Sequence, residues 1–319
     1  MDLGIKDKRV LVTGASGVLG SNLAFFYKAR YHVVGVYRHN FMDLQNVRMV
    51  QADLSSGDQV DRLIDRHDPD VVIHCAAIPD IDRCEMDPAE TYRQNVLTVK
   101  NFVRSLQGRG IKFVLLSTDN VYNANGGHTE DELGPPVNEY GRSKLRGEKA
   151  ALSLKDAVVL RTTFFGCGNC CRKTHSEQMI LSLLRGEKFK GFDDVFFSPI
   201  YVFDLSEIIE QVFRKDLNGI YNVGSSNGTS KFALLRQIAL SLGLNTDLIE
   251  PISVDSLSLT AARNKNAVMN VSRISAALGV KMPDVTQTAA RFADDLRRGV
   301  IPEGSILENG ILCRSSKLL

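Results

Sequence analysis

Two side chains that could move a proton, Tyr140 and Lys144, stand four positions apart in the segment NEYGRSKLRGEKA. The segment has the pattern of a helix, on which residues four apart share one face. A free tyrosine has a pKa of about 10, and a neighbouring ammonium lowers that pKa because it favours the phenolate. The tyrosine could then exchange a proton with a carbonyl or hydroxyl oxygen. Because the same spacing occurs on ordinary helices, the pair alone does not establish a site.

A hydroxyl group follows the apolar run at 112–117. Thr118 stands where a buried strand is expected to end, and open parallel sheets bind ligands at the carboxyl ends of their strands. A threonine there could orient and polarise a substrate oxygen, although a solvent-facing threonine at a strand end would have the same sequence. The order of the three residues along the chain fits one site and favours a catalytic role for Thr118, Tyr140 and Lys144.

Three glycines lie between the first expected strand and the first expected helix. Gly14, Gly17 and Gly20 occur in VLVTGASGVLGSNLAFF with the spacing G-x-x-G-x-x-G. Glycine permits a tight turn and lets the backbone approach a diphosphate, and the amides of the following helix favour the phosphate charges. A plain turn between strand and helix is the alternative. The position after the first strand of an alternating pattern favours a dinucleotide site.

The residues after the second expected strand indicate which dinucleotide is bound. Sites for NAD usually carry an acidic residue there for the ribose 2′-hydroxyl, whereas this chain has Tyr37, Arg38 and His39. A guanidinium is suited to a 2′-phosphate, so Arg38 favours NADP(H), unless it is an ordinary surface arginine; NAD(H) stays open. Asp53, after the third strand, could accept a hydrogen bond from the adenine amino group or cap the helix that begins near Ser55.

An alternation of short β-branched runs and longer segments must position these residues. Strands are expected at 9–13, 32–37, 47–53, 70–77, 112–118 and 157–162, with a helix at 21–30 after the glycine turn. Repeated strand and helix order gives right-handed crossovers and a mostly parallel sheet. The strands are apolar almost throughout, as in sheets covered on both faces. The sequence therefore predicts an α/β fold with a doubly wound parallel sheet of the Rossmann type.

After Gly166 the alternation becomes less regular. Helical spacing appears at 174–186, 204–213, 230–243 and 272–279, in several cases after an Asp or Ser cap. We expect residues 1–165 to form a dinucleotide-binding domain and residues 166–319 to form mainly a smaller α+β substrate-binding lobe, with about 201–225 returning to the main sheet. The stretch 301–319 has no strong pattern and is expected to be a mobile tail.

The composition excludes several classes of protein. The 319 residues carry 39 Lys and Arg against 37 Asp and Glu, a net charge of +2, which gives no reason to expect nucleic acid or an anionic membrane as a partner. No apolar run approaches the roughly 18 residues that span a bilayer, and the N-terminus lacks the pattern of a secretory signal. Six cysteines in a chain of this length do not indicate a disulfide scaffold. A cytoplasmic protein is expected.

The glycine turn, Thr118 and the Tyr140–Lys144 pair together resemble the extended short-chain dehydrogenase/reductase family. More narrowly, the chain is similar to the dTDP-4-dehydrorhamnose reductase group of sugar-nucleotide reductases, in stretches such as LLSTDNVY at 115–122, YGRSKLRGE at 140–148 and FSPIYVFDLSEII at 197–209. The resemblance covers nearly the whole chain. It implies that Thr118, Tyr140 and Lys144 are catalytic and that the partner is a nucleotide-sugar substrate; a homodimer is a further expectation.

The expected cofactor site combines the glycine turn, several strand ends and the catalytic pair. Its predicted residues are Gly14, Ser16, Gly17, Val18, Leu19, Arg38, Asp53, Leu54, Cys75, Ala76, Ala77, Asn95, Tyr140 and Lys144. By the family resemblance, the turn of Cys75, Ala76 and Ala77 would line the cofactor, and Asn95 would help to order the site. Expected substrate contacts are Asp119, Asn120 and Arg161, with Lys188 and Lys190 as further candidates for a diphosphate.

The chain departs from this group at two places. Asn120 stands where the reductases usually have an aromatic residue and where related dehydratases have the glutamate of an Asp-Glu pair. An amide cannot act as a general base, so dehydration is disfavoured. The loop with Cys167, Cys170 and Cys171, near His175, is also unusual. It could hold a soft metal ion, but a flexible loop on the substrate side is the simpler interpretation, and no metal is expected.

The best interpretation is an NADPH-dependent reductase of the 4-keto group of a nucleotide-diphosphate deoxysugar. The nicotinamide would deliver hydride to the carbonyl carbon, and Tyr140 would give the proton to the oxygen. An epimerase that retains its dinucleotide through both half-reactions stays open. A non-catalytic NADP-binding regulatory subunit stays open too, because the β subunit of methionine adenosyltransferase resembles this group. The complete set of Thr118, Tyr140 and Lys144 argues against that last alternative.

Overall fold

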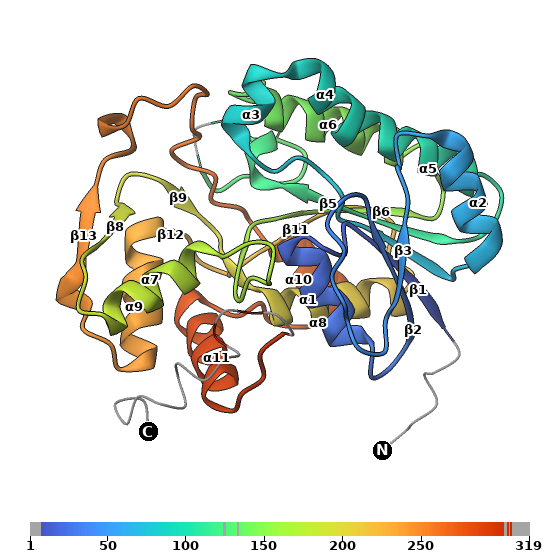
Figure 1. Ribbon diagram of the computed structural model, residues 1–319. Helices are drawn as coiled ribbons and strands as arrows, with labels where there is room; N and C mark the ends of the chain where they lie inside the picture. Colours follow the sequence, from blue (N-terminus) through green and yellow to red (C-terminus); the bar gives the residue numbers. More distant parts are fainter. Residues whose placement is uncertain (1–7, 124–125, 133, 303–304, 306, 308–319) are drawn as a thin grey trace.

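A seven-stranded parallel sheet forms the centre of the protein, in the strand order β11-β6-β5-β4-β1-β2-β3 (Figure 1). The computed structural model describes residues 8–123, 126–132, 134–302, 305 and 307. The strands of the sheet are β1 Arg9–Thr13, β2 His32–Tyr37, β3 Arg48–Gln51, β4 Val71–His74, β5 Lys112–Thr118, β6 Ala157–Thr162 and β11 Gly219–Val223. Every neighbouring pair is parallel. The predicted doubly wound α/β fold is confirmed.

Helices cover both faces of this sheet. On one face lie α2 (Gly57–His67), α5 (Thr98–Leu106) and α6 (Glu139–Ala151), and on the other lie α1 (Val18–Tyr27), α8 (Val202–Arg214) and α10 (Ser272–Leu278). Val10 and Val12 of β1 pack with α1, whereas Leu11 packs on the opposite side with α2 and α5, as the two-residue period of a strand requires. Because both faces are covered, β4, β5 and β6 are buried along their whole length.

Two strands are shorter than their apolar runs in the sequence. β3 begins at Arg48 and ends at Gln51, and β4 ends at His74 although the apolar run continues to Ala77. The hydroxyl of Thr13, the last residue of β1, accepts hydrogen bonds from the amides of Cys75 and Ala76, both at 3.1 Å. These bonds take the residues after β4 out of the ladder and into a loop.

A nearly continuous helical segment connects β4 to α5. It consists of α3 Ile81–Met86, α4 Pro88–Tyr92 and a π-helical turn at Arg93–Leu97. The side chains of Asp80 and Asp87 cap α3 and α4, because each accepts a hydrogen bond from the backbone three residues later at 3.0 Å. The π turn buries Asn95 between the loop after β4 and α6.

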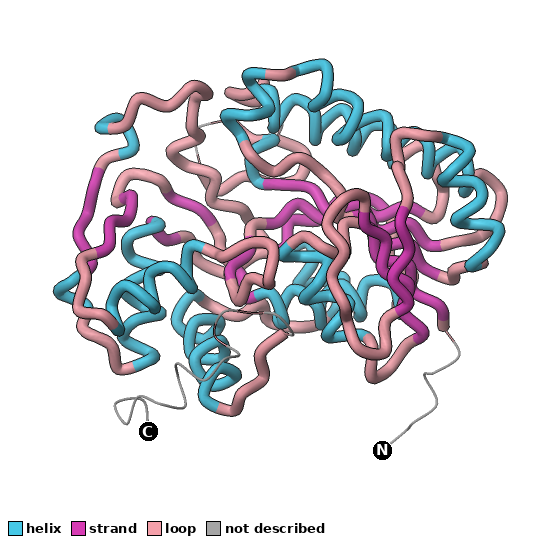
Figure 2. The backbone as a smooth tube through the Cα atoms, viewed as in Figure 1, coloured by secondary structure: helices cyan, strands magenta, loops and turns pink. Residues whose placement is uncertain are grey.

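The second half of the chain adds a smaller lobe (Figure 2). This lobe has its own apolar core. Its elements are β7 Phe164–Phe165, α7 His175–Leu184, β8 Phe189–Phe192, β9 Phe196–Phe197, β10 Ile200–Tyr201, β12 Thr229–Ser230, α9 Lys231–Leu242, β13 Ile249–Ile252 and α11 Val285–Arg297. The lobe also contains 3₁₀ turns at Thr246–Leu248 and Val254–Ser256, and a further 3₁₀ turn, Asp119–Val121, follows β5 in the first half of the chain. The short strands form the ladders β10-β7, β12-β9 and β13-β8. Between them the chain returns to the main sheet through α8 and β11, which pairs with β6.

Two further expectations concern the C-terminal stretch and membrane-spanning helices. The stretch 301–319, expected to be a tail, lies almost wholly outside the described residues. Within those residues, no helix combines the length and the apolar character that a membrane span requires.

Candidate functional site

A cavity of about 840 Å³ lies at the carboxyl ends of the central strands. Most of the residues predicted for the cofactor, the substrate and catalysis line it, namely Gly14, Ser16, Gly17, Val18, Leu19, Arg38, Leu54, Cys75, Ala76, Ala77, Thr118, Asp119, Asn120, Tyr140 and Lys144. Three predicted residues, Asp53, Asn95 and Arg161, do not belong to the lining. The structure therefore brings the glycine turn and the Thr118, Tyr140 and Lys144 side chains to one cavity.

The glycine turn leaves backbone amides facing the cavity. Gly14 has a φ of +66°, a backbone conformation that residues other than glycine rarely adopt. At Gly20, an added Cβ would lie 2.2 Å from the Gly14 carbonyl oxygen, so helix α1 can pack against the turn only with glycine there. Helix α1 begins after Gly17 with no side-chain cap. The first amides of the helix are therefore available to an anion, and the helix dipole favours negative charge there.

Arg38 lines the end of the cavity next to β2. Its guanidinium Nη1 lies 3.7 Å from Glu90 Oε1 of α4, so a 2′-phosphate bound there would share this cation with Glu90. The carboxylate of Asp53 accepts hydrogen bonds from the amide of Ser55 at 3.0 Å and from its hydroxyl at 2.8 Å. Asp53 therefore orders the turn before α2 but does not cap this helix as predicted, because the N-cap residue is Ser56.

Thr118 and Tyr140 come from two elements that meet at the cavity. Thr118 is the last residue of β5, and Tyr140 lies in the first turn of α6. The side chain of Asn138 caps this helix, because it accepts a hydrogen bond from the Gly141 amide at 2.9 Å. The Thr118 side chain lies near enough to the Tyr140 phenol to lower the pKa of that phenol slightly. Two proton-bearing oxygens thus face the same part of the cavity.

Lys144 lies one helical turn after Tyr140 but does not act on it as the sequence predicts. Its ammonium donates a hydrogen bond to the Leu116 carbonyl at 2.7 Å, and burial lowers the pKa of Lys144 to about 8. Burial raises the pKa of Tyr140 well above its usual value, with a smaller opposing effect from the nearby Thr118 side chain. The predicted lowering of the tyrosine pKa is therefore wrong for the protein without ligand.

Asp119 and Asn120 follow Thr118 in a 3₁₀ turn and also line the cavity. The Asp119 carboxylate accepts hydrogen bonds from the Thr118 hydroxyl at 3.1 Å and from the Asn120 amide group at 2.9 Å. Burial raises the pKa of Asp119 to about 6, although the positive charge of Lys231 acts in the opposite direction. The site thus holds a carboxyl group that changes charge in mildly acidic solution.

Asn95 is buried behind the cavity wall. Its carbonyl oxygen accepts a hydrogen bond from the Ile78 amide at 2.7 Å, and its side-chain nitrogen donates to the Ile78 carbonyl at 3.2 Å and to the Ser143 hydroxyl at 3.0 Å. These bonds fix the loop after β4 against α6. The structure therefore places Asn95 where it orders the wall, without direct contact with the cavity.

Arg161 of β6 is fully buried, and its predicted contact with substrate is wrong. Its guanidinium pairs with Glu148 of α6 through Nη2 at 2.7 Å and through Nε at 3.1 Å. The remaining donor, Nη1, bonds the Tyr122 hydroxyl at 2.8 Å and the Glu130 carbonyl at 2.9 Å. A charged residue can be buried when its hydrogen bonds are satisfied in this way.

Two lysines considered for a diphosphate also lie away from the cavity. Lys188 and Lys190 flank and belong to β8, outside the lining. The ammonium of Lys188 pairs with Glu250 at 2.6 Å. Neither lysine is placed to contact a ligand in this cavity.

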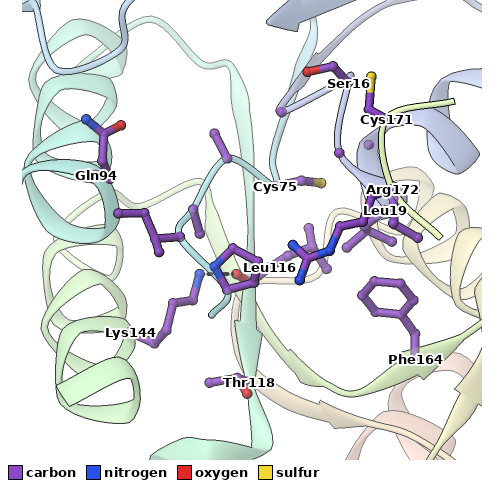
Figure 3. Close-up of a pocket in the computed structure, with 18 of the residues that line it drawn as sticks. Ser16, Leu19, Cys75, Gln94, Leu116, Thr118, Lys144, Phe164, Cys171 and Arg172 are labelled. Atoms are coloured by element: carbon purple, nitrogen blue, oxygen red, sulfur yellow. Dashed lines mark hydrogen bonds between the residues drawn. The ribbon is translucent and has the colours of Figure 1, made fainter. Parts of the chain in front are cut away.

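Residues that the sequence did not indicate as cofactor, substrate or catalytic residues complete the cavity from the second half. They include Phe164 and the consecutive residues Cys171, Arg172, Lys173, Thr174 and His175. Figure 3 shows the Arg172 side chain extending into the cavity from the side of Leu19 and Phe164, toward the side where Lys144 lies. Ligands bind at the carboxyl ends of parallel strands, and this rule predicted Thr118 at the end of β5. The same rule applied to β6 would have indicated this loop.

The cysteine-rich loop borders this same wall. Cys167 is buried, whereas Cys170 and Cys171 are exposed, with their sulfur atoms 3.7 Å apart. Within the part of the chain that the structure describes, no three His, Cys, Asp or Glu side chains gather as metal ligands.

Known proteins are similar to this chain over most of its length. The family model of the RmlD substrate binding domain matches residues 8–298. The probable low-salt glycan biosynthesis reductase Agl14 of Haloferax volcanii is 30% identical over 294 residues, which cover 89% of this chain and 98% of that protein. Methionine adenosyltransferase 2 subunit beta of Rattus norvegicus is 27% identical over 296 residues, which cover 86% of this chain and 83% of that protein.

A solved structure extends the similarity to three dimensions. The crystal structure of a dTDP-4-dehydrorhamnose reductase from Bacillus anthracis in complex with NADP matches with a TM-score of 0.79 and 25% identity. The match covers 90% of this chain and 99% of that one.

Proposed function

The chain belongs to the family of the RmlD substrate binding domain, and on that premise we propose that it is an NADPH-dependent reductase of a nucleotide-diphosphate 4-keto-deoxysugar. The observation that carries the proposal is a single cavity bordered by an uncapped glycine turn and by Thr118, Tyr140 and Lys144. The similar reductase of Bacillus anthracis, which was solved with NADP, supports both the reaction class and the cofactor.

The cavity fits a dinucleotide in three respects. The first amides of α1 have no side-chain cap and can bind phosphate. A Cβ at Gly14 would lie 3.0 Å from the Ala76 backbone, so glycine keeps the two strand ends close together. The guanidinium of Arg38 lines the end next to β2, where a 2′-phosphate would lie. NADP(H) is the cofactor that these residues would hold, and when bound it supplies the hydride.

Tyr140 gives the proton that completes the reduction. Because burial raises its pKa, the phenol is protonated at neutral pH and can donate to the carbonyl oxygen of the substrate. The neighbouring Thr118 hydroxyl orients the same oxygen. Lys144, one turn further along α6, would hold the ribose on the nicotinamide side of the cofactor.

Asp119 and Asn120 contact the sugar in this proposal. Both line the cavity directly after Thr118. Dehydration of a sugar needs a base that removes a proton next to the carbonyl group, and the amide of Asn120 cannot act as one. Reduction needs no such base, so the side chains after β5 favour hydride transfer over elimination.

The loss of NADPH absorbance in the presence of a panel of keto-sugar nucleotides tests the proposal. A reductase oxidises NADPH with at least one 4-keto substrate, and Tyr140→Phe serves as the inactive control. An epimerase would interconvert sugar nucleotides without net loss of NADPH. The similarity to a methionine adenosyltransferase subunit adds a third outcome of this test. A regulatory subunit would bind NADPH and a protein partner but turn over no substrate.

The proposal also assigns a ligand to each half of the chain. Residues 1–165 bind the dinucleotide, and residues 166–319 bind mainly the sugar nucleotide. We further propose a cytoplasmic homodimer; the five described cysteines are free thiols, which fits a reducing compartment. Light scattering of the purified protein measures the oligomeric state.

A further inference from the structure

The loop between β7 and α7 is tied to the glycine turn by side-chain amides. The side-chain nitrogen of Asn169 donates to the Ser16 carbonyl at 3.2 Å and to the Ser21 hydroxyl at 2.9 Å. From the other side, Asn22 of α1 donates to the Cys167 carbonyl at 3.0 Å. The loop therefore has a fixed position over the turn that faces the dinucleotide.

Asn169 also shapes the tight turn that ends at Arg172. Its side-chain oxygen accepts hydrogen bonds from the backbone amides of Cys171 and Arg172, both at 3.0 Å. The backbones of Asn169 and Arg172 exchange two more bonds, at 3.0 and 3.2 Å. Asn169 is 2% exposed, so these bonds are shielded from water. The turn directs the Arg172 side chain into the cavity, as Figure 3 shows.

The positive charge of Arg172 is not neutralised by any residue that the structure describes. Across the described residues, its guanidinium takes part in no ion pair and no hydrogen bond. Two other cations of the cavity are already engaged, because Lys144 donates to the Leu116 carbonyl and Arg38 lies near Glu90. An arginine that extends into a cavity without a partner is available to an anionic ligand.

We propose that Arg172 binds the diphosphate of the dinucleotide from the side opposite the glycine turn. This inference rests on the proposed function, because it requires a bound dinucleotide. The turn offers neutral amide donors to a group that carries two negative charges, and a guanidinium adds a charged, forked donor. A sugar nucleotide also contains a diphosphate, but the tether to Ser16 and Ser21 places Arg172 over the cofactor turn.

Dissociation constants for three probes test this assignment. The probes are NADPH, adenosine 2′,5′-bisphosphate, which lacks the second phosphate of the diphosphate, and dTDP. We expect Arg172→Gln to weaken NADPH binding by about tenfold or more, the size of one charge-assisted hydrogen bond, and to affect the bisphosphate much less. Arg172→Lys keeps the charge but not the fork and should lose less affinity.

The matched control is Arg185→Gln, which makes the same chemical change at the end of α7. Arg185 pairs with Glu187 at 2.8 Å and does not line the cavity, so NADPH binding should be unchanged. Equal NADPH affinity of wild type and Arg172→Gln would overturn the inference, and so would weakened dTDP binding with unchanged NADPH binding. If the wild type and the control bound no NADPH at all, the proposed function itself would fail, which is a separate outcome.

Discussion

The ammonium of Lys144 donates its hydrogen bond to the carbonyl oxygen of Leu116, 2.7 Å away at the end of β5. This bond engages the ammonium with the strand, whereas the i, i+4 spacing suggests the phenol of Tyr140 as its partner. The lysine lines the cavity, where the proposed function gives it the cofactor ribose as a partner. A ribose hydroxyl could take over the bond from Leu116, so the influence of Lys144 on Tyr140 should depend on bound cofactor.

Replacement of Lys144 by methionine should weaken NADPH binding and also lower turnover. The reason is that the buried ammonium would hold the ribose and, once there, favour the phenolate. Because the pKa of Lys144 is lowered to about 8, the ammonium is charged below that pH and neutral above it. NADPH affinity of the wild type should therefore fall as the pH rises through about 8, and the methionine variant should lose this dependence.

Fluorescence titration of NADPH between about pH 6 and pH 9.5 measures this effect. Lys149→Met is the matched control, because Lys149 is exposed on the same helix. If Lys144→Met kept the NADPH affinity and pH profile of the wild type, Lys144 would have no contact with the cofactor.

Replacement of Tyr140 by phenylalanine should abolish most turnover and leave NADPH affinity nearly unchanged. The phenol oxygen acts on the substrate oxygen, and general acid catalysis typically contributes about 10²–10⁴-fold. Steady-state kinetics and NADPH titration of the same preparation separate the two effects. For ketone reduction the phenol must start protonated, so on the alkaline side kcat/KM should fall as the pH rises through the tyrosine pKa. A variant that retained most of the wild-type rate would refute this mechanism.

The main sheet and the glycine turn were predictable because their signals are local. Apolar runs of five to seven residues gave β1, β2, β5 and β6 at their observed positions, since a strand buried on both faces needs no partner information to be recognised. The end of β4 was not predictable in this way. It depends on the Thr13 hydroxyl, about 60 residues earlier, which binds the amides after His74.

Arg161 and Arg172 show why the charged residues of the site were harder to assign. Arg161 belongs to β6 and Arg172 follows it. The sequence alone favours Arg161 as a ligand contact. The burial of Arg161 depends on Glu148 and Tyr122, which lie 13 and 39 residues away in the chain. The exposure of Arg172 to the cavity depends on the bonds of Asn169 to the glycine turn, 148 to 153 residues away. Such contacts leave no periodic signal.

Replacement of Arg38 by alanine should reduce NADPH affinity by about tenfold or more and leave NADH affinity nearly unchanged. A charge-assisted contact to the 2′-phosphate contributes roughly 1.5–3 kcal/mol. Glu90 competes for this guanidinium at 3.7 Å, so Glu90→Gln should strengthen NADPH binding slightly. Titration of the three proteins with both cofactors tests the assignment. Equal NADPH affinity in wild type and Arg38→Ala would exclude a role for Arg38.

Replacement of Arg161 by methionine should destabilise the protein by about 3–5 kcal/mol, because it leaves the buried Glu148 carboxylate without its charged partner. Urea denaturation measures the free energy of unfolding. Arg146→Met is the control, since the Arg146 side chain is half-exposed and its partner Glu139 keeps a second cation, Arg142, so the loss should be at most about 1 kcal/mol. The KM for the sugar nucleotide should be unchanged in folded Arg161→Met. A large rise in KM without loss of stability would show that Arg161 contacts the substrate.

The carboxyl group of Asp119 should make substrate binding depend on pH in mildly acidic solution. Burial raises its pKa to about 6, so the group is a charged acceptor above that pH and a neutral acid below it. As an acceptor it would bind a sugar hydroxyl, and the KM for the keto-sugar nucleotide should therefore rise as the pH falls through about 6. Asp119→Asn should have the higher KM at every pH and should lose this dependence, while NADPH affinity stays near the wild-type value. Initial rates between about pH 5 and pH 8 at saturating NADPH measure both profiles. If the two proteins shared one pH profile of KM, Asp119 would not contact the substrate, and its buried charge would serve only to hold Thr118 and Asn120 in place.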